Sequence, residues 1–217
     1  MPTENGCRTG IRFLGITAMK SSRTISIFIA SAVIVIAGAV FVVTAFNIYP
    51  LDDSSIEVAT STPVITQPAA KPARLEIPAI EVEAEVVEVG VTADGSMATP
   101  KKAGDVGWYK YGVPPGQVGS AVIDGHVDNT FAFPGVFRNL KKLQIGDDVY
   151  IDTEAGERLH FVVEDIRSYP YKSAPAEEIF ASADGVRLNL ITCTGAWIRR
   201  EQTYDRRLVV YTRLQES

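Results

Sequence analysis

The pattern of hydrophobic and polar residues divides the chain into two unlike parts. Residues 25–46 form an apolar run of 22 residues without a charge. As an α-helix this run would be about 33 Å long, which is enough to cross a bilayer. After residue 74 the apolar residues instead come in short runs or alternate with polar ones. This pattern therefore predicts one transmembrane helix followed by a β-rich domain.

The charges that flank the apolar run predict its orientation. Cations precede the run and acidic residues follow it, namely Arg8, Arg12, Lys20 and Arg23 before it and Asp52, Asp53 and Glu57 after it. The positive-inside rule then makes residues 1–24 cytoplasmic and residues 25–46 an uncleaved signal anchor. A cleaved signal peptide is the alternative, but the run is longer than the usual apolar region of such a peptide.

The segment after the anchor reads as a tether. Residues 47–73 are rich in Ser, Thr, Pro and Ala and have no amphipathic period, which is typical of a solvated linker. A flexible chain of this length spans roughly 25 Å root-mean-square. We therefore expect an extracytoplasmic domain at 74–217 that is held close to the cell membrane.

Short strands dominate the predicted domain. Alternating or apolar runs predict strands at 81–87, 120–123, 148–152, 159–163, 187–192 and 208–213, and only 136–143 and 176–181 favour short helices. Asp-Gly, Pro-Gly and Ile-Gly-Asp turns separate the runs. An all-β barrel or sandwich with a few short helices follows from this pattern.

The charge composition limits the partners and cofactors that we expect. The net charge of −5 and the isoelectric point near 5.1 argue against a nucleic-acid partner. Glu81, Glu83 and Glu85 are interpreted as a solvated strand face, and we expect neither a metal nor another cofactor.

Cys193 is the lone cysteine on the predicted outer side of the membrane, since Cys7 precedes the anchor. A cysteine without a disulfide partner in an oxidising compartment suggests chemistry.

A catalytic cysteine needs a proton donor or acceptor and a group that stabilises an oxyanion. The predicted domain has two histidines, His126 just after an apolar strand and His160 within a strand. We interpret His160 as a surface or half-buried strand residue and His126 as the partner of Cys193. Cys193 is predicted to be a partly exposed, reactive thiol at the end of its strand. The Arg206-Arg207 pair that opens the last strand supplies the candidate oxyanion donor.

Four motifs in this order resemble the sortases, which are bacterial cysteine transpeptidases. They are Arg-Leu-Glu-Ile-Pro-Ala-Ile at 74–80, Gly-His-Val-Asp at 125–128, Leu-Ile-Thr-Cys at 190–193, and an arginine before Leu-Val-Val-Tyr at 208–211. The segments 106–109, 115–116 and 134–137 look most like class F sortases. Class D or E is the alternative, because the sequence around Arg206 and Arg207 departs from class F, and Asp124 departs from the small residue that many relatives carry before the Gly-His pair.

The resemblance implies a closed β-barrel and a set of roles. Cys193 would form a thioacyl intermediate with a Leu-Pro-x-Thr-type sorting signal, His126 would protonate the leaving amine, and Arg207 would stabilise the oxyanion, with Arg206 as the alternative. Thr192 and Trp197 would contribute to substrate binding. The expected partners are secreted proteins with a C-terminal sorting signal and an amine acceptor from a peptidoglycan precursor or a pilin lysine.

Two other functions fit the same residues. A cell-wall cysteine peptidase or amidase would use the same cysteine and histidine but transfer the acyl group only to water. A non-catalytic extracytoplasmic β-domain would use Cys193 as a packed small hydrophobe. Alkylation of Cys193 distinguishes the binding module from the enzymes, and an added amine distinguishes transfer from hydrolysis.

Overall fold

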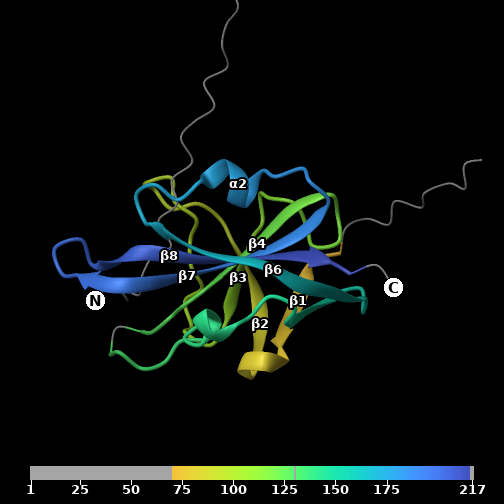
Figure 1. Ribbon diagram of the computed structural model, residues 1–217, viewed down its shortest axis with the longest axis horizontal. Coiled ribbons are helices and arrows are strands. Elements are labelled where there is room, and N and C mark those ends of the chain that lie inside the picture. Colours follow the sequence, from red (N-terminus) through yellow and green to blue (C-terminus); the bar gives the residue numbers. More distant parts are fainter. Residues whose placement is uncertain (1–69, 130, 216–217) are drawn as a thin grey trace, which may run out of the picture. The chain divides into compact units, whose positions relative to one another are not determined.

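The computed structural model describes residues 70–129 and 131–215, which form a closed barrel of β-strands (Figure 1). The strands follow one another around the barrel in the order β1-β2-β3-β4-β7-β8-β6-β5. Their bounds are Pro72–Ile77 (β1), Val82–Val89 (β2), Val106–Tyr109 (β3), Gly119–Gly125 (β4), Asp148–Thr153 (β5), Arg158–Pro170 (β6), Val186–Ile198 (β7) and Thr203–Leu214 (β8). The helical elements are η1 (Pro78–Ile80), η2 (Leu140–Lys142) and α2 (Ala176–Phe180). The all-β prediction is confirmed.

The predicted cytoplasmic segment, the predicted anchor and most of the predicted linker lie outside the described residues. Within the described ranges, no helix combines the length and the apolar character that a membrane crossing requires. The last two residues of the predicted linker, Pro72 and Ala73, belong to β1.

All six predicted strands are present and all are longer than predicted, three of them at least twice as long. β6, β7 and β8 have 13, 13 and 12 residues. The predicted helix at 136–143 is wrong, because only the single turn η2 forms there. The backbone amides of Val136 and Phe137 donate to the carbonyl groups of Ala103 and His126, so they are used in tertiary contacts.

Two apolar clusters cover opposite faces of the central strands. The larger cluster fills the barrel and includes Leu190 of β7 and Val210 of β8. The smaller one lies on the outer face, where Ile191 and Val209 of the same two strands pack with Ile179 of α2. Because side chains alternate along a strand and both faces are covered here, the central parts of β7 and β8 are apolar on both faces.

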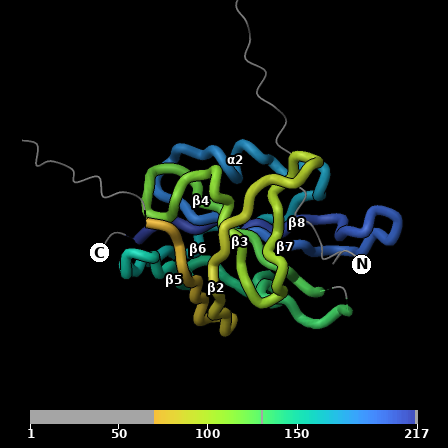
Figure 2. Tube along the Cα trace, turned by 180° about the vertical axis from the view of Figure 1, so that it is seen from behind, coloured from red at the N-terminus to blue at the C-terminus, as the bar shows by residue number. Residues whose placement is uncertain are grey.

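Two parallel pairings bring distant parts of the chain together. β2 pairs with β3 and β4 pairs with β7 in parallel, whereas the other pairings are antiparallel. Figure 2, which views the barrel from behind, shows β2 and β3 side by side. The end of β4 therefore meets β7 near residue 193, far along the sequence.

Candidate active site

The register of three neighbouring strands places Cys193 opposite Arg207 and brings the end of β4, which precedes His126, alongside β7. In the antiparallel β7–β8 pair, Cys193 lies directly opposite Arg207. In the parallel β4–β7 pair, Asp124 lies opposite Ile191, and His126 follows directly after the last residue of β4, Gly125. Residues directly opposite in a sheet present their side chains on the same face.

These three residues share the outer face of the barrel. Cys193 is two residues from Ile191, and Arg207 is two residues from Val209, and both of these apolar side chains belong to the outer cluster. His126 has the same parity as Val122 of that cluster. The β7–β8 register shift falls beyond Thr194 and does not disturb this alternation. The three side chains of His126, Cys193 and Arg207 therefore lie next to the outer apolar cluster, at one end of the strands.

His126 is buried, with 7% of its surface exposed. Its Nε2 atom lies 2.8 Å from the Pro100 carbonyl oxygen. Since a carbonyl only accepts hydrogen bonds, Nε2 carries a proton. Nδ1 is buried and has no hydrogen-bond partner in the described part of the chain. Nδ1 is therefore the ring nitrogen that is left to exchange a proton with a reacting group.

Close backbone packing holds the residues around His126. A Cβ atom on Gly135 would lie 2.3 Å from the His126 carbonyl oxygen, so only glycine fits there without a shift. A Cβ atom on Gly125 would lie 2.5 Å from the Phe137 ring. The Phe137 amide donates to the His126 carbonyl at 2.9 Å. The chain that follows β4 thus folds back onto His126 and fixes its backbone.

Arg207 is almost fully buried, with 1% of its surface exposed. Its Nη1 atom donates to the Tyr204 carbonyl at 2.9 Å, and its Nη2 atom donates to the Thr203 hydroxyl at 3.0 Å. Its guanidinium carbon lies 5.3 Å from the centre of the Tyr171 ring. Burial lowers the pKa of Arg207 to about 10, because removal from water disfavours the charged form. Arg207 remains a cation at neutral pH.

Cys193 is more buried than the sequence analysis predicted. The predicted partly exposed thiol is wrong, since only 3% of the Cys193 surface is exposed. A thiolate is the nucleophilic form of cysteine, so nucleophilic chemistry at Cys193 requires that its thiol loses a proton.

Arg206 and Thr192 lie on the other face of their strands. Arg206 is opposite Thr194 and donates to the side chain and the carbonyl of Ser168 on β6. The Thr192 hydroxyl donates to the Gly125 carbonyl at 2.8 Å. Thr192 therefore ties β7 to the residue before His126, and its part in substrate binding stays a prediction.

Trp197 lies further along β7, opposite Tyr204 of β8. It is 40% exposed and packs edge-on against the Tyr204 ring at 5.2 Å. The Tyr204 hydroxyl donates to Asp128, two residues after His126. Burial, followed by Asp128, raises the pKa of Tyr204 to about 12. This contact joins the β7–β8 hairpin to the loop after His126, and sequence reasoning missed it.

His160 lies far from this group. Its Nε2 atom is 2.7 Å from Asp148 Oδ1, and its ring stacks on Tyr150. It is ten residues along β6 from Pro170, which pairs with Arg206, so the separation is roughly 30 Å at about 3.3 Å per residue. The interpretation of His160 as a surface or half-buried strand residue is confirmed.

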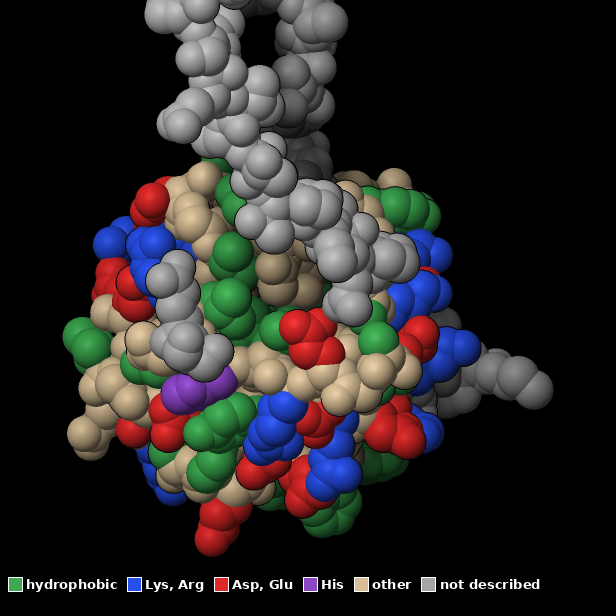
Figure 3. All heavy atoms as spheres, turned by 90° about the vertical axis from the view of Figure 1, so that its right-hand side faces the viewer, with side chains coloured by type: hydrophobic (Ala, Val, Ile, Leu, Met, Phe, Trp, Pro, Cys, Tyr) green, Lys and Arg blue, Asp and Glu red, His purple; other side chains and the backbone are tan. Residues whose placement is uncertain are grey.

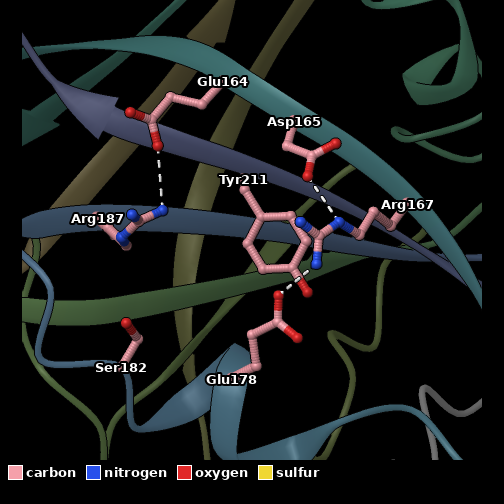
Figure 4. A pocket seen from close by; sticks show the side chains of 7 residues that line it. All are labelled: Glu164, Asp165, Arg167, Glu178, Ser182, Arg187 and Tyr211. Atoms are coloured by element: carbon pink, nitrogen blue, oxygen red, sulfur yellow. Dashed lines mark hydrogen bonds and ion pairs between the residues drawn. The ribbon is translucent and has the colours of Figure 1, made fainter.

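A polar pocket of about 340 Å³ lies on the barrel where β6, β7 and β8 meet α2 (Figure 4). Its lining residues are Glu164, Asp165, Arg167, Glu178, Ser182, Arg187 and Tyr211. Arg187 pairs with Glu164 at 3.0 Å, and Arg167 pairs with Asp165 at 2.6 Å and with Glu178 at 2.7 Å (Figure 4). Tyr211 is four residues from Arg207 on β8, so the pocket is about 13 Å from the catalytic candidates along the strand.

Comparison with known protein families decides the assignment. The family model described as the sortase domain matches residues 75–215. The chain belongs to the sortase family. It is therefore a cysteine transpeptidase of the cell wall. No curated protein matches the chain in sequence.

Solved sortase structures share this fold at low sequence identity. Sortase C-1 from Actinomyces oris is 22% identical with a TM-score of 0.53, over 66% of this chain and 73% of that chain. The sortase D5 transpeptidase from Clostridium perfringens is 23% identical with a TM-score of 0.51, over 67% and 79%. A lid mutant of sortase A from Corynebacterium diphtheriae is 22% identical with a TM-score of 0.52, over 69% and 72%. These sortases carry the labels C, D and A, and at this identity they bear on the fold and not on the class.

Proposed function

We propose that this sortase is a membrane-anchored enzyme that cleaves a Leu-Pro-x-Thr-type sorting signal and joins the threonine acyl group to an amine. Cys193 is the nucleophile, His126 is the general acid and base, and Arg207 stabilises the oxyanion. The substrates are secreted proteins with a C-terminal sorting signal. The acceptor amine comes from a peptidoglycan precursor or a pilin lysine, and the resemblance in sequence favours class F.

The first half of the reaction breaks the peptide bond. The Cys193 thiolate attacks the threonine carbonyl carbon, and the carbonyl oxygen takes up the negative charge beside the Arg207 guanidinium. Protonated His126 transfers its Nδ1 proton to the leaving nitrogen as the C–N bond breaks. The products are a thioester on Cys193, a free amine and neutral His126.

The second half reverses the proton transfer. The acceptor amine attacks the thioester carbon, and His126 takes the proton that this amine loses. The C–S bond breaks, and Cys193 leaves as a thiolate beside protonated His126. The cycle is balanced, because one amide bond is broken and one is formed.

The observation that carries this proposal is the direct pairing of Cys193 with Arg207 in the β7–β8 register. It puts a buried cation on the same face as the nucleophile, at the point where negative charge develops. The single open ring nitrogen of His126 supports the acid and base role. A membrane anchor at 25–46 would raise the local concentration of enzyme and membrane-bound substrate.

The experiment uses the reduced full-length protein and a library of labelled Leu-Pro-x-Thr peptides, with and without an added amine. We expect cleavage after threonine and a product in which the threonine acyl group is joined to the amine. Transfer only to water at every amine concentration would identify a peptidase. Absence of cleavage in the reduced protein, together with a Cys193 that resists alkylation, would identify a binding module.

A further inference from the structure

The loop between Asp128 and Pro134 presents two phenylalanines to solvent. Phe131 is 80% exposed and Phe133 is 65% exposed. The backbone amides of both residues donate to the Asn129 side chain, at 2.9 and 3.0 Å. A further bond joins the Asn129 amide to the Phe133 carbonyl at 3.0 Å. The loop is thus closed by its own hydrogen bonds while its largest side chains remain outside the core.

Trp197 lies on a second projection, the β7–β8 hairpin. The hairpin and the loop after β4 extend from the same side of the barrel, on the left in Figure 1 and on the right in Figure 2. Tyr204 joins them, because its ring packs on Trp197 and its hydroxyl donates to Asp128. We call Phe131, Phe133 and Trp197 the aromatic tips. They are exposed apolar groups on two connected projections.

Arginines accompany the aromatic tips. Arg199 and Arg200 are exposed at the turn of the hairpin. Arg138 is exposed as well, and its charge acts on Tyr204, so it lies close to the same contact. Glu201 of the turn is already paired with Lys172 at 3.0 Å. This end of an otherwise acidic chain therefore offers positive charge next to aromatic surface.

The opposite side of the barrel has a different surface. Figure 3, which views the right-hand side of Figure 1, shows basic and acidic side chains interspersed. Such mixed charge is typical of a face that stays in water. Large exposed aromatic side chains instead mark an interaction site.

We propose that the aromatic tips dock on a lipid bilayer that contains anionic lipids. Aromatic rings favour the membrane interface, and arginines bind anionic headgroups. The apolar run at 25–46 predicts a bilayer within reach of a tether of roughly 25 Å. A second copy of the chain is a poorer fit, because a standard interface buries about 800 Å² on each partner, more than three aromatic side chains at 150–250 Å² each supply when only partly buried.

Docking in this way sets the orientation of the domain. His126 is two residues before Asp128, and Arg207 is three residues after Tyr204. The catalytic candidates therefore lie at the end of the barrel that carries the aromatic tips. The domain would work with this end toward the membrane. The inference extends beyond the proposed reaction and does not depend on it.

Fluorescence quenching tests the docking directly. Trp197 and Trp108 are the two tryptophans of the chain, and Trp108 is only 5% exposed. The full-length protein is reconstituted in vesicles of phosphatidylcholine and phosphatidylglycerol whose acyl chains carry bromine. We expect bromine to quench Trp197, and the Trp197→Phe variant to lose the quenched emission. The double variant Phe131→Ser/Phe133→Ser should reduce quenching at least threefold.

Matched controls separate docking from general effects. Val118 is 70% exposed and precedes β4, at the opposite end of that strand from His126, so Val118→Ser should leave quenching unchanged. Arg199→Gln/Arg200→Gln should remove the dependence of quenching on phosphatidylglycerol. Lack of Trp197 quenching in the wild type, or quenching that the double Phe variant does not change, would overturn the proposal. Concentration-dependent dimers that disappear in the double Phe variant would overturn it in favour of a second copy.

Discussion

Arg207 beside Cys193 and Arg167 in the polar pocket lie in opposite electrostatic environments. Arg167 is half exposed and pairs with two carboxylates, and Tyr169 and Asp165 raise its pKa. Arg207 is buried and donates to carbonyl and hydroxyl oxygens, and burial lowers its pKa to about 10. The surroundings of Arg167 favour its positive charge, whereas burial disfavours the positive charge of Arg207.

The free-energy cost of burying the Arg207 charge is larger than that of any charge in the polar pocket. A shift of the Arg207 pKa from 12.5 to about 10 corresponds to about 3 kcal/mol against the charged form. Carbonyl and hydroxyl acceptors orient the guanidinium without cancelling its charge. In the proposed mechanism, Arg207 would stabilise an anion that forms beside Cys193. The ion-paired residues that line the polar pocket carry no comparable free-energy cost of burial.

Histidine substitution should give the largest contrast between regions. We expect His126→Gln to lower turnover about a thousandfold, since a general acid contributes 10²–10⁴ to a rate. His160→Gln should change turnover little, because His160 is roughly 30 Å away by the β6 register. Initial rates with a labelled sorting peptide measure both variants. Equal losses would mean that His126 has no special role.

Arginine substitution tests the β7–β8 register next. Arg207→Met should lower turnover about a hundredfold, because an oxyanion donor contributes about 3 kcal/mol. Its free energy of unfolding should change by no more than about 1 kcal/mol, since relief of the buried charge offsets the lost hydrogen bonds. Arg206→Met, which alters the Ser168 side of β8, is the matched control for turnover. An inactive Arg206→Met with an active Arg207→Met would assign the oxyanion to Arg206.

Substitution of Gly135 should have a smaller effect on turnover. Gly135→Ala places a methyl group against the His126 carbonyl, so the loop must shift and we expect turnover to fall about tenfold. Gly104→Ala is the control, because a Cβ atom there meets nothing within 4 Å. Peptide turnover and thermal unfolding of the two variants test this. Equal behaviour of the two variants would mean that the loop does not position His126.

The polar pocket should give the smallest effect. Glu164→Gln removes the partner of Arg187 at 3.0 Å and of Arg213 at 2.5 Å. Because these pairs lie near the surface, we expect a loss of less than about 1 kcal/mol in unfolding free energy and unchanged turnover. Chemical denaturation and peptide turnover measure the two effects. A large loss of turnover would connect the pocket with the catalytic site.

The sequence predicted the fold class, most strands and the grouping of His126 with Cys193 by resemblance. It could not assign a face to Arg206 or Arg207 from alternation, because the structure buries both faces of β8 in two clusters. The register of β8 against β7 resolves this, and register depends on the pairing of whole strands. Strand pairing is a tertiary property that local pattern does not contain.

Other features of the site also depend on distant contacts. Asp128 and Tyr204 are 76 residues apart, and neither carries a local signal for the other. The Pro100 carbonyl that fixes the His126 ring is 26 residues from it. The burial of Cys193 depends likewise on packing of the outer face, whereas the sequence analysis inferred exposure from its position at a strand end.

Intact-mass spectrometry of the reduced full-length protein with a Leu-Pro-x-Thr peptide tests the central claim most directly. Without an amine acceptor, we expect the protein mass to increase by the acyl fragment that ends in threonine. Hydroxylamine should remove this adduct, because it cleaves thioesters, and Cys193→Ala should not form it. An adduct that persists in Cys193→Ala, or a reduced protein that cleaves the peptide without forming any adduct, would contradict the account.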